Sequence, residues 1–212
     1  MNIISHRGLW TTEAEKNTEI AFRRSFSAGF GTETDIRDYC GELVISHDIA
    51  HAGCMLFSEF LEIYSQYSQH LPLALNIKAD GLQNKLSIEL NKYRITNYFV
   101  FDMSVPDGIG YIKVGLRTFT RQSEFEINPA YYEYAKGVWI DEFEDHWVTE
   151  DIINGHLVAG KEVCLVSPEL HSRSKSAIWK HYKEISRNLQ GTANLMICTD
   201  SPEDAQRMFN ED

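Results

Sequence analysis

Basic residues are scarce in this sequence. Its 212 residues include 20 Lys and Arg against 31 Asp and Glu, which gives a formal net charge of −11 at pH 7. Surfaces that bind polyanions need an excess of basic side chains, so the composition argues against nucleic acid and anionic membranes as general partners. A small phosphorylated molecule is compatible with it, because a few cations or a bound metal can attract phosphate inside a cleft.

Cysteine is also rare, and the four cysteines lie far apart at positions 40, 54, 164 and 198. None of their spacings is typical of a zinc site, so we expect reduced thiols. Cys164 and Cys198 fall inside apolar runs, where packing in the core is the expected role.

Long apolar runs and glycine-rich loops are absent from the sequence. No segment has the length of a membrane span, and no charged leader with an apolar stretch follows Met1, so we expect no stable membrane insertion and a cytoplasmic location. The chain also lacks the glycine-rich loop of dinucleotide-binding proteins and the phosphate-binding loop with its lysine.

What the sequence does contain is a regular alternation of short apolar runs with stretches of helical spacing. The runs, which we expect to be strands, cover residues 3–4, 33–36, 73–77, 98–101, 116–119, 138–140, 162–166 and 195–197. Helical spacing is clear at 57–64 and 82–90, and residues such as Asn17 and Thr149 are suited to cap helices. This alternation predicts an α/β fold with parallel strands, and it fits a (β/α)8 TIM barrel as a single domain over residues 1–212.

Polar residues mark the ends of the expected strands, which is where barrels of this type place their active sites. In chain order they are His6, Arg7, Glu33, Asp35, Asn76, Lys78, Asp102, Arg121, Asp141, Glu142, Glu169, His171 and Asp200. His47 ends a short extra strand after the second barrel strand. His6 and His47 could divide acid and base work, because an unperturbed histidine titrates at about pH 6.5.

Two pairs of polar residues share one side of a strand. The period-two geometry of strands directs Glu33 and Asp35 to the same face, and likewise Asn76 and Lys78 on the next strand. Two like charges on one face are unfavourable without a cation between them, which favours a metal site. The alternative is that these carboxylates merely pair with Arg7 and Lys78.

A motif in several parts runs through the chain. It consists of Ser5-His6-Arg7-Gly8, Asn17-Thr18 with Ala21-Phe22, Ala28-Gly29 with Glu33-Thr34-Asp35-Ile36, the segment 41–48 ending in Ser46-His47-Asp48, and Cys198-Thr199-Asp200-Ser201-Pro202. In order and spacing it resembles the glycerophosphodiester phosphodiesterases, strongly over the first 50 or so residues and weakly beyond. The resemblance implies a TIM barrel of the phospholipase-C-like phosphodiesterase type, a divalent metal such as Mg²⁺ or Ca²⁺, and a role in lipid metabolism.

The resemblance also implies roles for individual residues. His6 and His47 would be the catalytic acid and base, and Arg7 and Lys78 would contact the phosphate. Glu33 and Asp35 would be metal ligands. Trp10 follows the turn at Arg7 and Gly8, so it could line the cleft against an organic head group.

The sequence departs from the family's pattern in three places. Asn76 stands where the family usually has a glutamate ligand. An amide oxygen can still coordinate Mg²⁺ or Ca²⁺, but the site then has one negative charge fewer and should bind the metal more weakly. Asp102, at the end of the next strand, could supply the missing carboxylate. Glu15 and Lys16 replace the usual proline and glutamate. The segment after Asp48 is too short for a large insertion, so we expect an open cleft.

Three functions are consistent with these features. The leading interpretation is a phosphoric diester hydrolase that converts a glycerophosphodiester or related alcohol phosphodiester into an alcohol and a phosphomonoester. A lyase that stops at the cyclic phosphate is a second, and a catalytically weakened barrel that binds a phosphorylated ligand is a third. The alcohol groups, the preferred metal and the oligomeric state stay open.

Overall fold

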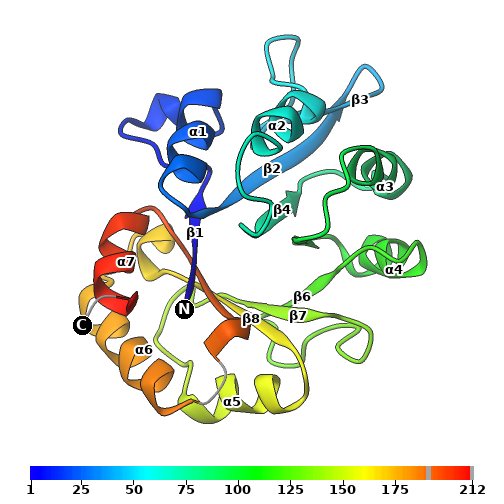
Figure 1. Ribbon diagram of the computed structural model, residues 1–212. Coiled ribbons are helices and arrows are strands. Elements are labelled where there is room, and N and C mark those ends of the chain that lie inside the picture. Colours follow the sequence, from blue (N-terminus) through cyan, green and yellow to red (C-terminus); the bar gives the residue numbers. More distant parts are fainter. Residues whose placement is uncertain (190–191, 211–212) are drawn as a thin grey trace. The chain divides into compact units, whose positions relative to one another are not determined.

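Strands and helices alternate along the chain in the computed structural model, which describes residues 1–189 and 192–210 (Figure 1). The chain forms two compact units, one of Ser5–Thr118 and one of Met1–Ile4 with Phe119–Asp212. The first strand, β1 (Asn2–His6), therefore contributes to both. The predicted alternation of strands and helices is confirmed, whereas a single domain over residues 1–212 stays a prediction.

The unit Ser5–Thr118 contains the end of β1 and the elements that follow it. These are α1 (Glu19–Ser27), β2 (Gly31–Tyr39), β3 (Glu42–Ile45), α2 (Phe57–Tyr64), β4 (Leu73–Ile77), α3 (Gln83–Lys92), β5 (Tyr98–Phe101) and α4 (Val105–Lys113), with the 3-10 turn η1 (Glu13–Glu15) before α1. β4 lies between β2 and β5 and is parallel to both. β3 pairs antiparallel with β2, which is the short extra strand that the sequence predicts.

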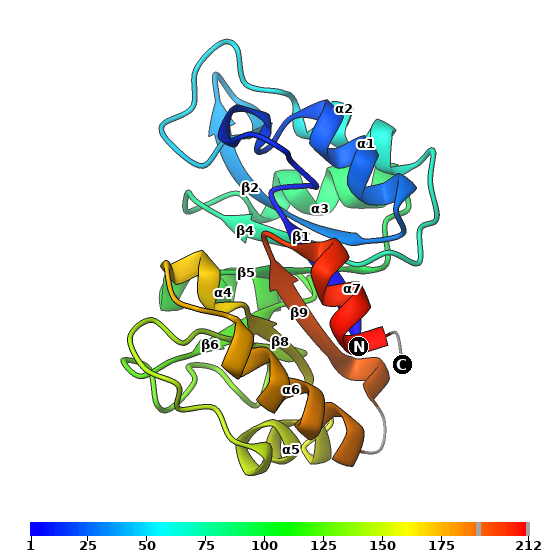
Figure 2. The ribbon, with the colours of Figure 1, turned by 90° about the vertical axis from the view of Figure 1, so that its left-hand side faces the viewer.

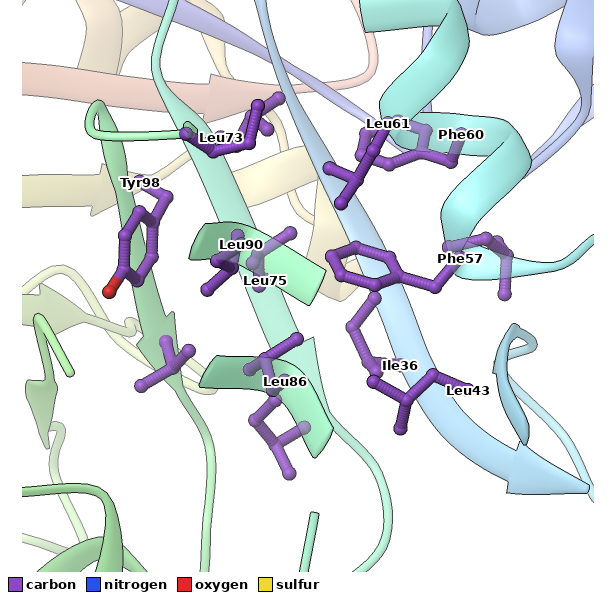
Figure 3. Close-up of a cluster of buried hydrophobic side chains, with 14 of the residues drawn as sticks. Ile36, Leu43, Phe57, Phe60, Leu61, Leu73, Leu75, Leu86, Leu90 and Tyr98 are labelled. Carbon is purple, nitrogen blue, oxygen red and sulfur yellow. The ribbon is translucent and has the colours of Figure 1, made fainter. Parts of the chain in front are cut away.

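Helices α1, α2 and α3 cover this sheet through a large apolar cluster (Figure 3). Aromatic rings form part of it: Phe22 and Phe60 meet edge to face with ring centroids 4.7 Å apart, and Phe26 and Tyr64 do so at 5.3 Å. Burying each such ring stabilises the fold by about 1.5–3 kcal/mol relative to leaving it in water. Because side chains of β2 and β4 belong to this cluster, the packing fixes the positions of both strands.

The unit that contains Phe119–Asp212 has the same construction. Its elements are β6 (Phe119–Gln122), β7 (Gly137–Ile140), α5 (Glu150–Val158), β8 (Glu162–Val166), α6 (Ser176–Asn188), β9 (Leu195–Thr199) and α7 (Pro202–Asn210), with 3-10 turns η2 (Pro168–His171) and η3 (Thr192–Asn194). The strands are parallel in the order β6-β7-β8-β9. Helix α7 packs against α6 and β9 (Figure 2).

Two features differ from the sequence-based expectations. The strand expected at 116–119 begins only at Phe119, because Gly115 takes a left-handed φ of 79° and Leu116 N–H bonds back to the Tyr111 carbonyl (3.1 Å), closing the end of α4. Between Gln122 and Gly137, a fully described stretch, turns and loops connect β6 to β7 without a helix.

Other expectations can be compared directly with the structure. None of the four cysteines forms a disulfide, and Cys164 and Cys198 are fully buried, as predicted. Thr149 caps α5 by accepting a hydrogen bond from Ile152 N–H (3.4 Å). Asn17 does not cap α1, because that helix begins one residue later with Thr18 at the cap position. No helix in the described part of the chain is both long and apolar enough to cross a membrane.

Candidate active site

The part of β2 from Glu33 to Ile36, which pairs with β4, anchors the polar segments of the unit Ser5–Thr118. Three backbone hydrogen bonds hold them there: Arg7 N–H to the Glu33 carbonyl (3.0 Å), Ser46 N–H to the Asp35 carbonyl (3.0 Å) and Lys78 N–H to the Ile36 carbonyl (2.9 Å). The bonds come from the segments after β1, β3 and β4, which the sequence separates widely. Every residue assigned to the site from the sequence lies in this unit.

Glu33 and Asp35 are buried, and Asp35 has two cationic neighbours. The Arg7 Nε atom lies 3.1 Å from Asp35 Oδ2, an ion-pair distance, although its N–H does not point at that oxygen. Lys78 Nζ lies 3.6 Å from Asp35 Oδ1 and 3.2 Å from Asp102 Oδ2. The pairing that the sequence offered as an alternative to a metal is thus present, and Asp102 takes part in it through Lys78.

Glu33 is the more perturbed of the two carboxyl groups. Burial and the neighbouring Asp35 charge raise the pKa of Glu33 from 4.5 to about 7, despite opposing effects of His6, Arg7 and Lys78. Its Oε2 accepts a hydrogen bond from Arg7 N–H (3.2 Å) and lies 3.9 Å from His6 Nε2. Without a further cation, this carboxyl group therefore holds a proton at slightly acidic pH.

Two buried oxygens at the site have no hydrogen-bond partner. They are Asp35 Oδ1 and Asn76 Oδ1, and the register of β2 and β4 places these two residues side by side. A buried polar atom without a partner costs about 1–3 kcal/mol. Because Mg²⁺ and Ca²⁺ prefer oxygen ligands, the pair fits a hard divalent cation with Glu33 as a third donor.

This donor set differs from a site made only of charged ligands. No group of three or more His, Cys, Asp or Glu within the described residues has the arrangement of a metal site. A cation here would be held by two carboxylates and an amide, with Arg7 and Lys78 already close to Asp35. With one negative charge fewer than three carboxylates, such a donor set would hold a cation less tightly.

The two histidines lie in different surroundings. His6 ends β1, and 16% of its side chain is exposed, whereas His47 follows β3 and is 45% exposed. His47 Nδ1 bonds to Asp48 Oδ1 (2.9 Å), and this bond lowers the pKa of the Asp48 carboxyl. Since a carboxylate can only accept, the proton of neutral His47 lies on Nδ1, which leaves Nε2 as an acceptor. Arg37 fixes the same segment by donating to the His47 carbonyl (3.2 Å).

A cleft of about 480 Å³ lies beside His47. Arg7, Asn17 and two residues that the sequence does not assign to the site, Lys16 and His51, help to line it. His51 Nδ1 accepts a hydrogen bond from Gly53 N–H (3.1 Å), so neutral His51 carries its proton on Nε2. His51 follows His47 by only four residues, and this closeness is the one feature of the sequence that suggests such a placement, although a solvated loop is the more usual expectation.

Trp10 lies next to the first histidine. Its indole N–H donates to the His6 carbonyl (3.1 Å), and Lys16 Nζ stands 4.3 Å from the ring centroid. Glu15 forms an ion pair with Arg24 of α1.

The turn after β1 depends on glycine. Arg7 and Gly8 both have positive φ, 57° and 86°. A Cβ on Gly8 would come within 2.8 Å of the Ala21 backbone, so only glycine allows α1 to approach this closely. The close approach sets the position of Arg7 beside β2.

Strand-end residues of the unit with Phe119–Asp212 form hydrogen bonds of their own. His171 Nε2 lies 3.0 Å from Asp141 Oδ1, and buried Glu142 accepts from Tyr182 Oη (2.8 Å). Glu169 accepts from Asp200 N–H (3.3 Å). These contacts account for the burial of Asp141 and Glu142.

No family model and no curated protein matches the sequence. A protein from Galdieria sulphuraria that has been assigned as a glycerophosphodiester phosphodiesterase superimposes with a TM-score of 0.76 at 16% sequence identity. The match covers 99% of this chain and 97% of that one. The chain has the fold of the glycerophosphodiester phosphodiesterases.

Two further structures support this assignment of the fold. The enzyme from Agrobacterium tumefaciens has a TM-score of 0.68 at 16% identity, with 96% of this chain and 97% of that chain covered. An Oleispira antarctica phosphodiesterase, solved with its product sn-glycerol-3-phosphate, has a TM-score of 0.67 at 15% identity, covering 99% and 97%. The predicted (β/α)8 TIM barrel is confirmed, and the coverage leaves no room for a large insertion.

Proposed function

We propose that this protein is a metal-dependent phosphoric diester hydrolase that acts on glycerophosphodiesters or related alcohol phosphodiesters. One observation carries the proposal. Around the part of β2 that pairs with β4, the structure brings together buried Glu33 and Asp35, the cations Arg7 and Lys78, and an oxygen of Asn76 without a hydrogen-bond partner. The fold shared with glycerophosphodiester phosphodiesterases supports it.

Arg7 and Lys78 are suited to hold the phosphate. Each side chain is 20% exposed, so each can contact a ligand while its charge is balanced by Asp35. A guanidinium can donate to two phosphate oxygens at once, and an ammonium acts as a compact point charge. Charge that develops on the phosphate oxygens would be stabilised by these groups without reorganisation.

His6 and His47 would divide the proton transfers. One imidazole removes the proton from the attacking oxygen, and the other donates a proton to the departing alcohol. The Nε2 atom of His47, left as an acceptor by the Asp48 bond, is suited to either step. The attacking oxygen can be water or a neighbouring hydroxyl of the substrate, which gains from proximity.

The divalent metal would be held by Glu33, Asp35 and Asn76. Asp102 is a further candidate ligand, because Lys78 contacts both Asp102 and Asp35. When bound, such a cation neutralises negative charge on the phosphate oxygens. Mg²⁺ and Ca²⁺ are the expected metals because all the donors are oxygens.

A small-molecule diester is the proposed substrate. The Oleispira antarctica phosphodiesterase binds sn-glycerol-3-phosphate as product, and a glycerol phosphate fits the charges described here. The cleft beside His47 would receive the departing alcohol. We propose no nucleic-acid partner because the net charge is −11.

Hydrolysis of a panel of glycerophosphodiesters, with and without chelator, tests the proposal. We expect activity that requires added Mg²⁺, Ca²⁺ or Mn²⁺ and falls at least 100-fold in His6→Ala and His47→Ala, following the ~10²–10⁴-fold contribution of general acid–base catalysis. His70→Ala, at an exposed position of the same unit, is the matched control. Full activity in either active-site variant would refute the mechanism. Accumulation of a cyclic phosphate would indicate the lyase, and binding without turnover the weakened barrel.

A further inference from the structure

Asn17 contacts the site through three groups, although helix capping is the only role that the sequence predicts for it. Its backbone N–H donates to the Arg7 carbonyl (3.0 Å), and its side-chain Nδ2 donates to Asp35 Oδ2 (2.8 Å). Its Oδ1 accepts a hydrogen bond from the Thr34 hydroxyl (2.8 Å). Both ends of the amide are therefore engaged by consecutive residues of β2.

The chemistry of these partners fixes the orientation of the amide. Ionised Asp35 can only accept hydrogen bonds, so the NH2 end of Asn17 must face it. Thr34 is fully buried, and its hydroxyl then donates to the remaining amide oxygen. A flipped amide would set two acceptors against each other at Asp35.

The backbone at Asn17 is suited to this role. Its φ of 59° is left-handed, a conformation that asparagine tolerates better than most residues. Thr18 takes the cap position of α1, with extended φ and ψ, so helix capping does not account for Asn17.

The contact makes the two oxygens of Asp35 unequal. Oδ2 accepts from Asn17 at 2.8 Å and has Arg7 Nε at 3.1 Å. Oδ1 has no hydrogen-bond partner and only Lys78 Nζ at 3.6 Å, and its residue is paired in register with Asn76. We propose that Asn17 is a positioning residue that holds Asp35 with Oδ1 directed to the cation, and that Thr34 fixes the amide for this purpose. The inference rests on the proposed function, because it concerns the same carboxylate.

Metal affinity is the decisive readout, because loss of stability alone would not change it. Binding of Mn²⁺ is measured from the electron paramagnetic resonance signal of the free ion, with thermal denaturation recorded in parallel. Asn17→Gly removes the side chain and tolerates the left-handed backbone. Thr34→Val keeps the size of the buried side chain and removes the hydroxyl. Arg94→Gly is the control, since exposed Arg94 also has a left-handed φ of 56°.

We expect Asn17→Gly to weaken Mn²⁺ binding roughly 10-fold or more, in the range known for groups that orient metal ligands. Thr34→Val should weaken it less, and Arg94→Gly should leave it unchanged. Unchanged affinity in Asn17→Gly would overturn the inference and leave the proposed function intact. If Asn17→Gly does not fold, unchanged affinity in Thr34→Val would overturn it. Failure of the unmodified protein both to bind Mn²⁺ and to hydrolyse diesters would overturn both proposals.

Discussion

Replacing Glu33 by glutamine should make the metal-free protein more stable at alkaline pH. The pKa of Glu33 is raised from 4.5 to about 7 by burial and by Asp35. The folded state therefore binds this proton more tightly than the unfolded state. The resulting stabilisation is complete below pH 4.5 and is lost as the pH rises through about 7. A neutral amide at this position avoids the loss.

The size of the effect follows from the shift in pKa. A shift from 4.5 to about 7 corresponds to about 3 kcal/mol at 1.36 kcal/mol per pH unit. For a chain of 212 residues, this should raise the melting temperature of Glu33→Gln by about 6–12 °C at pH 8. At pH 4 the glutamate is largely neutral in both the folded and the unfolded state, so the two melting temperatures should nearly coincide.

Thermal denaturation followed by circular dichroism in the presence of chelator measures this difference. Glu42→Gln, at an exposed strand position, is the control and should show no comparable gain. Adding Mg²⁺ at pH 8 should stabilise the unmodified protein and have less effect on Glu33→Gln. A difference that is equal at both pH values, or a loss of stability at pH 8, would refute the reasoning.

Three further predictions concern catalysis, packing and a second titration. One of the variants His6→Ala and His47→Ala lacks the general acid. That variant should retain more activity on a p-nitrophenyl diester than on an alkyl diester, because the p-nitrophenyl leaving group needs no proton. Equal losses of activity on both substrates in both variants would contradict this division of roles. Phe60→Ala should lower the free energy of unfolding, measured by urea denaturation, by about 3–5 kcal/mol, because the ring is fully buried among other aromatic residues. A loss below about 1 kcal/mol would contradict the described packing. Burial lowers the pKa of His156, so the unfolded state binds this proton more readily and stability should fall as the pH drops below about 6.5. The stability of His156→Gln should fall less over that pH range, and a pH profile identical to that of the unmodified protein would contradict the prediction.

Periodicity in the sequence predicts much of the site. The spacing of Glu33 and Asp35 places both on one face of a strand, and the next expected strand brings Asn76 alongside, as the register of β2 and β4 shows. Strong alternation of apolar runs gives β4, β5 and β8 with the correct bounds. Local pattern is sufficient there because every residue of β5, and all but one residue of β4 and of β8, is buried.

The missed features depend on backbone conformation and on contacts distant in sequence. The start of β6 is displaced because left-handed Gly115 ends α4 and draws Leu116 into its last turn. Asn17 resembles a helix cap in sequence, but its left-handed backbone turns the amide toward Asp35. The placement of His51 in the cleft depends on the fold of its loop. None of these conformations has a periodic signal.

The central claim is that the buried oxygens of Asp35 and Asn76 serve metal-dependent cleavage of a phosphodiester. Phosphorus NMR of the unmodified protein with a glycerophosphodiester tests it most directly, first in chelator and then after adding excess Mg²⁺ or Ca²⁺. The account predicts no turnover in chelator and, once the metal is added, loss of the diester signal with growth of a phosphomonoester signal. Turnover at the same rate in chelator, or an unchanged diester signal with every divalent metal, would contradict it.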